Sequence, residues 1–206
     1  RTGSFGRAAK AMGTKMKSVL GMGAKRASSA ALHLRKSITA PQAPPPLSTK
    51  TLNICKEVRE TEAAYINDIE TVLEVYVRPA IDQRMLTLED TQAIFANLEE
   101  LCRCASVLLE LMDREGGGDK VTVLAHAFIQ VTPFFKLYAF YCRNYERALK
   151  TLGTCRKSVP GFNDFLTRQS QLPRCRGLSL ESYLIKPVQR LTKYPLFFKD
   201  LLGQID

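Results

Sequence analysis

The stretch that most constrains the fold lies near the end of the chain, between Leu178 and Leu202. Apolar residues recur there at spacings of three and four, which predicts a helix with one apolar face. That face holds Leu180, Leu184, Val188, Leu191, Pro195, Phe198 and Leu202. We expect it to pack against the core of the protein.

The opposite side of the same helix is mainly polar. It holds Lys186, Gln189, Arg190 and Lys193. Leu196 and Phe197 also fall on this side, and two large apolar side chains on a polar face indicate that something covers them. Pro187 and Pro195 each remove a helical hydrogen bond. The pattern predicts a helix with two uses, one face for the core and the other for a partner.

The rest of the chain after Thr51 also has the helical period of 3.6 residues. Three long helices are predicted at about residues 50–77, 88–114 and 121–152, with a short one near 161–166. Arg78-Pro79 is expected to end or bend the first of them, and Pro133 to kink the third. No segment alternates like a strand. The sequence therefore predicts an all-α fold, an elongated bundle of long antiparallel helices with short connections.

The first predicted helix carries one charge inside its apolar stripe. Glu62 lies four residues after Val58 and four before Ile66, both of which belong to that stripe. A carboxylate in this position must be paired, or must lie where the stripe passes the edge of the domain. The pattern favours an ion pair within the protein and leaves a functional role open.

The formal charge of +10 is confined to the first fifty residues. Residues 1–50 contain 10 Lys and Arg and no acidic residue, whereas residues 51–206 contain 20 Lys and Arg and 20 Asp and Glu. The first segment also contains a proline-rich stretch, so we expect a basic, flexible N-terminal extension that can contact an anionic membrane. The neutral helical part argues against nucleic-acid binding.

Catalytic and metal-binding motifs are absent from the sequence. The six cysteines form no C-x-x-C pair, and His33 and His126 are the only histidines, so we expect no zinc site and no catalytic triad. The triple glycine at 116–118 follows no strand and precedes no Lys-Ser or Lys-Thr, so it is not a phosphate-binding loop. We expect a cytoplasmic protein without a cofactor that acts through a surface, and is peripheral at most on a membrane.

Three blocks of sequence, in a fixed order, resemble a known family. They are Val58–Tyr65 with its Thr-Glu-x-x-Tyr core, Pro133–Tyr145, and Leu184–Leu196, which contains Leu-Ile-Lys-Pro-Val-Gln-Arg-Leu-Thr-Lys-Tyr-Pro-Leu. Together they make residues 51–206 similar to the Dbl-homology domain of guanine-nucleotide exchange factors for Rho-family GTPases. The resemblance covers about three quarters of the chain.

The resemblance implies a function and a site. Family members release GDP from a Rho-family GTPase by stabilising its nucleotide-free state, without covalent chemistry. By matching position, Glu62 would hold the first switch of the GTPase. Gln189, Arg190 and Lys193 would engage the second switch, with Leu196 at the edge of the surface. The magnesium ion and the nucleotide belong to the GTPase, so no cofactor is implied.

The chain departs from the family pattern in two respects. Family members continue past the third block with a further long helix, so residues 51–206 are expected to lack the final C-terminal helix of the domain. Phe197-Phe198 also stands where the family often has aliphatic residues. An exchange-inactive helical scaffold is therefore the alternative interpretation, since such a protein would keep the fold and lose the activity.

Overall fold

The computed structural model describes residues 46–114 and 119–204, and this part of the chain is helical without a strand. The α-helices are α2 (Thr49–Thr71), α3 (Arg78–Asp82), α4 (Leu88–Phe95), α5 (Leu98–Met112), α6 (Lys120–Val131), α7 (Lys136–Ser158), α8 (Phe162–Ser170), α9 (Leu180–Leu184) and α10 (Lys186–Leu202). A π-helix, η2 (Val72–Val77), and two 3₁₀ turns, η3 (Thr132–Phe134) and η4 (Pro173–Cys175), connect some of them. The predicted all-α fold is confirmed.

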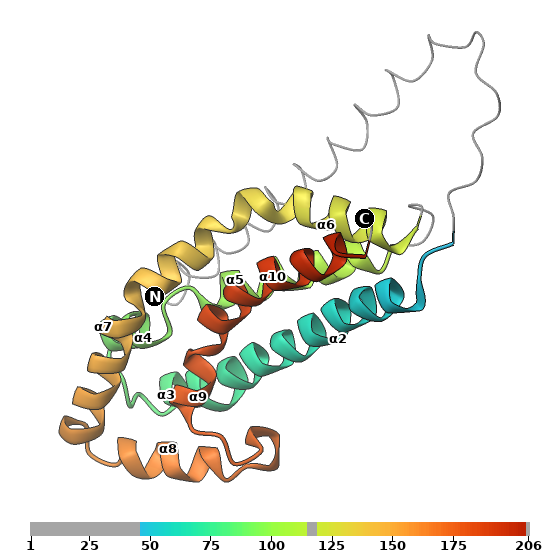
Figure 1. The fold of residues 1–206 in the computed structure, drawn as a ribbon. Coiled ribbons are helices and arrows are strands. Elements are labelled where there is room, and N and C mark those ends of the chain that lie inside the picture. Colours follow the sequence, from blue (N-terminus) through green and yellow to red (C-terminus); the bar gives the residue numbers. More distant parts are fainter. Residues whose placement is uncertain (1–45, 115–118, 205–206) are drawn as a thin grey trace, which may run out of the picture. The chain divides into compact units, whose positions relative to one another are not determined.

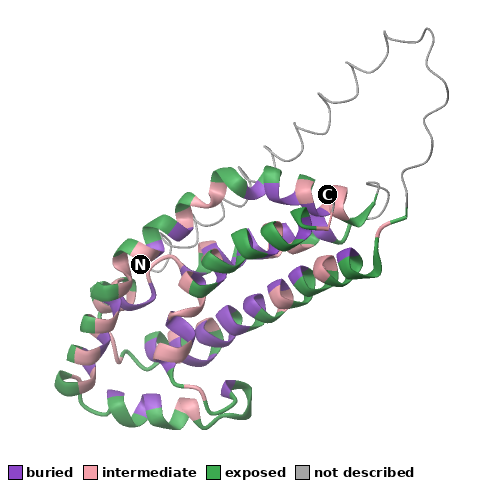
Figure 2. Ribbon diagram, in the orientation of Figure 1, coloured by how far each residue is buried: buried purple, intermediate pink, exposed green. Residues whose placement is uncertain are grey.

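Four helices form the body of the bundle that residues 48–204 build. α2, α5, α6 and α10 lie side by side and alternate in direction, while α7 and α8 extend from one end of this group (Figure 1). Their buried faces turn toward one another and their polar faces toward solvent (Figure 2). The short connections place sequential helices antiparallel, as expected for a helical bundle.

The first helix is longer than predicted. It starts at Thr49, where the side chain of Ser48 accepts a hydrogen bond from the Thr51 amide, and it continues through η2 and α3 to Asp82. Of the two alternatives expected at Arg78-Pro79, an end or a bend, the end is therefore wrong. Pro79 lies in the first turn of α3, directly after the π-helix, where the missing amide hydrogen costs least.

The other two long helices are each divided. Thr87 caps α4 by accepting a hydrogen bond from the Asp90 amide. The chain then breaks at Ala96, whose φ of 45° lies in the left-handed region, so the single helix predicted at 88–114 is two helices, α4 and α5. The kink predicted at Pro133 is confirmed by η3, which separates α6 from α7, and the bend there is 56°.

The C-terminal segment differs most from its prediction. It breaks at Ile185 into α9 and α10, and Leu180 and Leu184 are buried as expected. In α10, however, the buried residues are Pro187, Arg190, Tyr194, Phe197 and Leu201. The predicted core face is therefore wrong for this helix, which is rotated by roughly a quarter of a turn from the expected position.

The apolar residues of α10 that were expected to lie in the protein core border an open groove instead. Leu191, Pro195 and Phe198 line a cavity of about 400 Å³ together with Phe128 and Phe135, and Leu202 is 64% exposed. Phe197, which the sequence leaves unexplained, is covered by the described chain itself and retains only 9% exposure.

Two further expectations concern membranes and the extension. Among the described residues no single helix is long and apolar enough to cross a membrane. The bent pair Lys120–Phe134 and Lys136–Ser158 would be long and apolar enough only when its two helices are taken together. The predicted extension at residues 1–50 lies outside the described residues apart from its last five positions, of which Thr49 and Lys50 already belong to α2.

Candidate functional site

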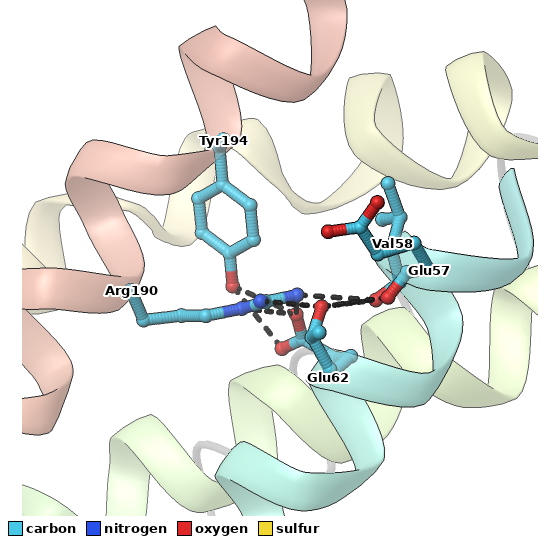
Figure 3. A network of polar contacts seen from close by, with 6 residues as sticks. Glu57, Val58, Glu62, Arg190 and Tyr194 are labelled. Carbon is cyan, nitrogen blue, oxygen red and sulfur yellow. Dashed lines mark hydrogen bonds and ion pairs between the residues drawn. The ribbon is translucent and has the colours of Figure 1, made fainter. Parts of the chain in front are cut away.

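The site is built around an ion pair that joins α2 to α10. Arg190 donates from Nε to Oε2 of Glu62 at 2.8 Å, and from Nη2 to the same oxygen at 2.5 Å (Figure 3). Both side chains are almost completely buried, Glu62 at 0% exposure and Arg190 at 4%. The ion pair that the sequence pattern favours for Glu62 is thus present, and its partner comes from the third of the sequence blocks.

Arg190 also reaches the backbone and a hydroxyl of α2. Its Nη1 donates to Oγ1 of Thr61 at 2.9 Å, and its Nη2 to the carbonyl oxygen of Val58 at 3.2 Å. Thr61 in turn donates to the carbonyl oxygen of Glu57 at 2.7 Å. Each nitrogen of the guanidinium is therefore bound to the first helix, and four of its five N–H donors are used there, as a buried charge requires.

Tyr194, one turn after Arg190, completes the cluster. Its hydroxyl donates toward the Glu62 carboxylate, 3.1 Å from both oxygens, and its ring lies 4.9 Å from the Arg190 guanidinium (Figure 3). The ring of Phe135 stacks on Tyr194 at 5.4 Å, and that of Phe128 meets it edge to face at 5.1 Å. Tyr194 therefore links the ion pair to α6 and to the turn before α7.

The electrostatics of the pair follow from its burial. Loss of hydration raises the pKa of the Glu62 carboxyl, and the charge and hydrogen bonds of Arg190, with a further bond from Tyr194, oppose that change. Burial disfavours the charged form of Arg190, but Glu62 and Tyr194 more than offset it and raise the pKa of the guanidinium. Each charge is tolerated because the other is present.

A second ionic cluster joins α2 to the chain around α9. The carboxylate of Asp68 accepts from Nζ of Lys186 at 2.6 Å and also pairs with Arg176. The Asp68 side chain is 9% exposed, whereas those of Lys186 and Arg176 are 24% and 53% exposed. Glu62, Asp68 and Arg190 are the buried charged residues of the described chain, so its buried charge is concentrated where α2 meets the C-terminal helices.

The five predicted site residues occupy one region but differ in exposure. Gln189, Lys193 and Leu196 lie on the exposed side of α10, and Leu196 retains 59% exposure. Arg190 points inward on the same helix and meets Glu62. The structure brings Glu62 of α2 into contact with Arg190 of α10, and it buries these two residues while leaving the other three exposed.

Sequence reasoning missed Tyr194 and Asp68 as parts of this region. Tyr194 follows Arg190 by four residues, so the two project from the same side of α10. On a helical wheel Tyr194 lies next to Arg190. This large aromatic side chain could have indicated that the side of α10 with Arg190 turns inward. Asp68 lies six residues after Glu62 on α2, and no spacing rule connects it to Lys186.

Metal ligands do not gather in the part of the chain that the structure describes. Within those residues no group of three His, Cys, Asp or Glu side chains is close enough to hold a metal ion. The region consists of exposed side chains on α10 and a buried ion pair that joins α10 to α2.

Comparison with known proteins agrees with this picture. Residues 54–206 match the RhoGEF domain family. Pleckstrin homology domain-containing family G member 2 of Mus musculus is 36% identical over 150 residues, which are 72% of this chain and 11% of that protein. Human Rho guanine nucleotide exchange factor TIAM2 is 29% identical over 187 residues, covering 80% of this chain and 11% of that protein.

A solved structure supports the fold. A structure of the Vav1 exchange factor superposes with a TM-score of 0.69 at 29% identity, over 75% of this chain and 42% of the other. The chain belongs to the RhoGEF domain family, the Dbl-homology domains. It spans 9% to 12% of the length of several curated relatives.

Proposed function

We propose that this domain accelerates GDP release from a Rho-family small GTPase. The observation that carries the proposal is the arrangement at α2 and α10. A surface strip of Gln189, Lys193 and Leu196 lies on the exposed side of α10, the helix whose Arg190 pairs with Glu62, in a chain whose RhoGEF domain match covers residues 54–206. Family membership supports the reaction, and the strip supports where the GTPase is bound.

The proposed mechanism needs no covalent step. An exchange factor binds the nucleotide-free GTPase more tightly than the GDP-bound form, so it lowers the free-energy barrier to GDP release. Lys193 supplies a positive charge, Gln189 a hydrogen-bonding amide and Leu196 an apolar contact. Electrostatic complementarity across such a surface selects the partner and its orientation.

The test is a mant-GDP release assay with this protein against a panel of Rho-family GTPases. We expect Lys193→Ala to lower the exchange rate at least tenfold, because a charge covered by a partner is worth roughly 2 kcal/mol or more. Lys199→Ala is the matched control, since Lys199 is also exposed on α10 but projects from another side. It should leave exchange unchanged.

Two results would contradict the proposal at different points. Equal activity of Lys193→Ala and the wild type would contradict the assignment of Gln189, Lys193 and Leu196 to the GTPase-binding surface. A wild-type protein that accelerates no GTPase in the panel would instead favour the exchange-inactive scaffold.

We also propose that residues 1–50 contact anionic membranes. Their ten Lys and Arg residues without an acidic residue support this contact, since each basic residue near an anionic surface adds roughly 1 kcal/mol of attraction. Sedimentation with phosphatidylserine liposomes, with and without residues 1–50, tests it. Unchanged binding after deletion would contradict the proposal.

A further inference from the structure

The helix α7 has a strong positive charge within a domain that is neutral as a whole. It carries six Lys and Arg residues and one acidic residue, Glu146, whereas residues 51–206 contain 20 basic and 20 acidic residues. The remainder of that range therefore has an excess of acidic residues. The net charge of the domain hides a local concentration of positive charge on α7.

Five of the six basic side chains lie on one side of the helix. At roughly 100° per residue, their positions fall within an arc of about 80° around the helix axis. This basic arc consists of Lys136, Arg143, Arg147, Lys150 and Lys157, all of them exposed. The buried residues of α7, among them Tyr141 and Leu152, fall on the opposite side. The basic arc therefore points away from the bundle, along the outer side of α7 that is exposed to solvent (Figure 2).

Most of the basic arc lacks an acidic partner. Lys150 pairs with Glu146 at 2.9 Å, and the other four residues form no ion pair with any residue that the structure describes. Towards the C-terminal end of α7, Asp90 of α4 lies beside Cys155, so a neighbouring helix brings negative charge there. The positive charge is least compensated in the first half of α7.

An exposed aromatic residue adjoins the same half of the helix. Phe140 is 46% exposed and lies one turn after Lys136 and one turn before Arg143. Lys and Arg attract anionic lipid headgroups, and an aromatic ring beside them is favourable at the boundary between headgroups and acyl chains. The arc from Lys136 to Lys150 follows the helix for roughly 20 Å, so it presents a row of cations that matches a flat anionic surface.

We propose that the outer side of α7 is a contact surface for an anionic lipid bilayer. Lys136, Arg143 and Arg147 lie against the headgroups, and Phe140 inserts between them. This contact belongs to the folded domain, and it depends neither on the contact proposed for residues 1–50 nor on nucleotide exchange. A helix bound along its length also restricts how the domain can be oriented on the membrane.

The central experiment measures the partition of this protein onto phosphatidylserine-containing vesicles and onto vesicles of phosphatidylcholine alone. Arg143→Gln/Arg147→Gln should lower the partition coefficient on the anionic vesicles by about tenfold or more, because two basic residues at the surface are lost. Arg103→Gln/Arg114→Gln is the matched control, since it removes the same charge from exposed positions in α5 and directly after it. It should change the coefficient by less than about twofold.

Salt separates the charged contact from the apolar one. The effect of Arg143→Gln/Arg147→Gln should nearly vanish in about 0.5 M NaCl, because exposed charges are screened. Phe140→Ser should weaken binding by about fivefold at low and at high salt, since insertion of an aromatic ring does not depend on charge. An effect of Phe140→Ser that disappears with salt would contradict the insertion.

Three results would overturn the proposal. Vesicle binding that is unchanged in Arg143→Gln/Arg147→Gln would do so directly. Equal losses in this variant and in Arg103→Gln/Arg114→Gln would show that only net charge matters. Retention of a DNA or RNA duplex without binding to anionic vesicles would assign the basic arc to nucleic acid instead. Failure of the exchange proposal would leave these results unaffected, because they measure lipid binding alone.

Discussion

Two ionic clusters join α2 to the C-terminal part of the domain, and they lie in different surroundings. The Glu62–Arg190 pair is dry, with both partners under 5% exposed and bound by Thr61, Val58 and Tyr194 as well. The Asp68 cluster opens to solvent through Lys186 and Arg176. Both clusters therefore pair a carboxylate with basic side chains, but one is buried and the other is partly exposed to solvent.

The difference shows what each cluster contributes. In a dry site the attraction between charges is strong, but each charge is costly if it loses its partner. In a wet site the attraction is weak, and solvent replaces a lost partner at little cost. The Glu62–Arg190 pair therefore specifies how α10 lies on α2, whereas the Asp68 cluster adds a modest attachment near α9.

The largest expected effect comes from removing one half of the dry pair. Arg190→Met should destabilise the domain by about 3–5 kcal/mol, because the buried Glu62 carboxylate would keep only the Tyr194 hydroxyl as a hydrogen-bond partner. Urea unfolding measures the change. The double variant Glu62→Leu/Arg190→Met should recover most of the lost stability. If the single and double variants are equally unstable, the loss is one of packing and not of charge.

A smaller effect is expected at the wet cluster. Asp68→Asn should cost about 1–2 kcal/mol, since it weakens the bonds from Lys186 and Arg176 while solvent compensates both cations. Urea unfolding with Asp82→Asn, at an exposed position, serves as the control. A loss as large as that of Arg190→Met would contradict the distinction between the clusters.

The dependence of stability on alkaline pH tests whether the surroundings of Glu62 exclude water. Burial, and then the charge of Glu62, raise the pKa of the Cys104 thiol to about 12 from its ordinary 9.0. Above pH 9 the thiol ionises in the unfolded chain but not in the folded one, so stability should fall as pH rises, by on the order of 1 kcal/mol at pH 10. Unfolding of Cys104→Ala between pH 8 and pH 10.5 should show a shallower decline. Parallel curves for the two proteins would contradict this.

The smallest effect is expected at the exposed ion pair between Arg59 of α2 and Asp113 after α5. The two side chains are 49% and 40% exposed. Arg59→Ala should give a urea midpoint close to that of the wild type, and any difference should vanish in 1 M NaCl. In the same salt series the effect of Arg190→Met should persist. Equal salt sensitivity of both variants would break the comparison between buried and exposed pairs.

The sequence indicated that Glu62 and the residues of α10 belong to one candidate site, but it did not indicate how those residues are oriented. Glu62 stood out because a carboxylate interrupts an apolar stripe, and its ion pair was expected. The partner was not predictable from spacing, because Arg190 lies 128 residues away. On α10, two neighbouring arcs satisfy the spacing of three and four, one through Leu191 and Phe198 and the other through Tyr194 and Phe197. Hydrophobicity alone favours the first arc.

The local sequence was sufficient for most helical segments and the all-α class, because prolines and the 3.6-residue period act over a few residues, but it did not predict the breaks at Ala96 and Ile185. It was also sufficient for the family, through three ordered blocks. Only the tertiary structure decided which arc of α10 is buried. The carboxylate of Glu62 and the rings of Phe128 and Phe135 come from distant helices, and together they make the arc with Arg190 and Tyr194 the better one to bury.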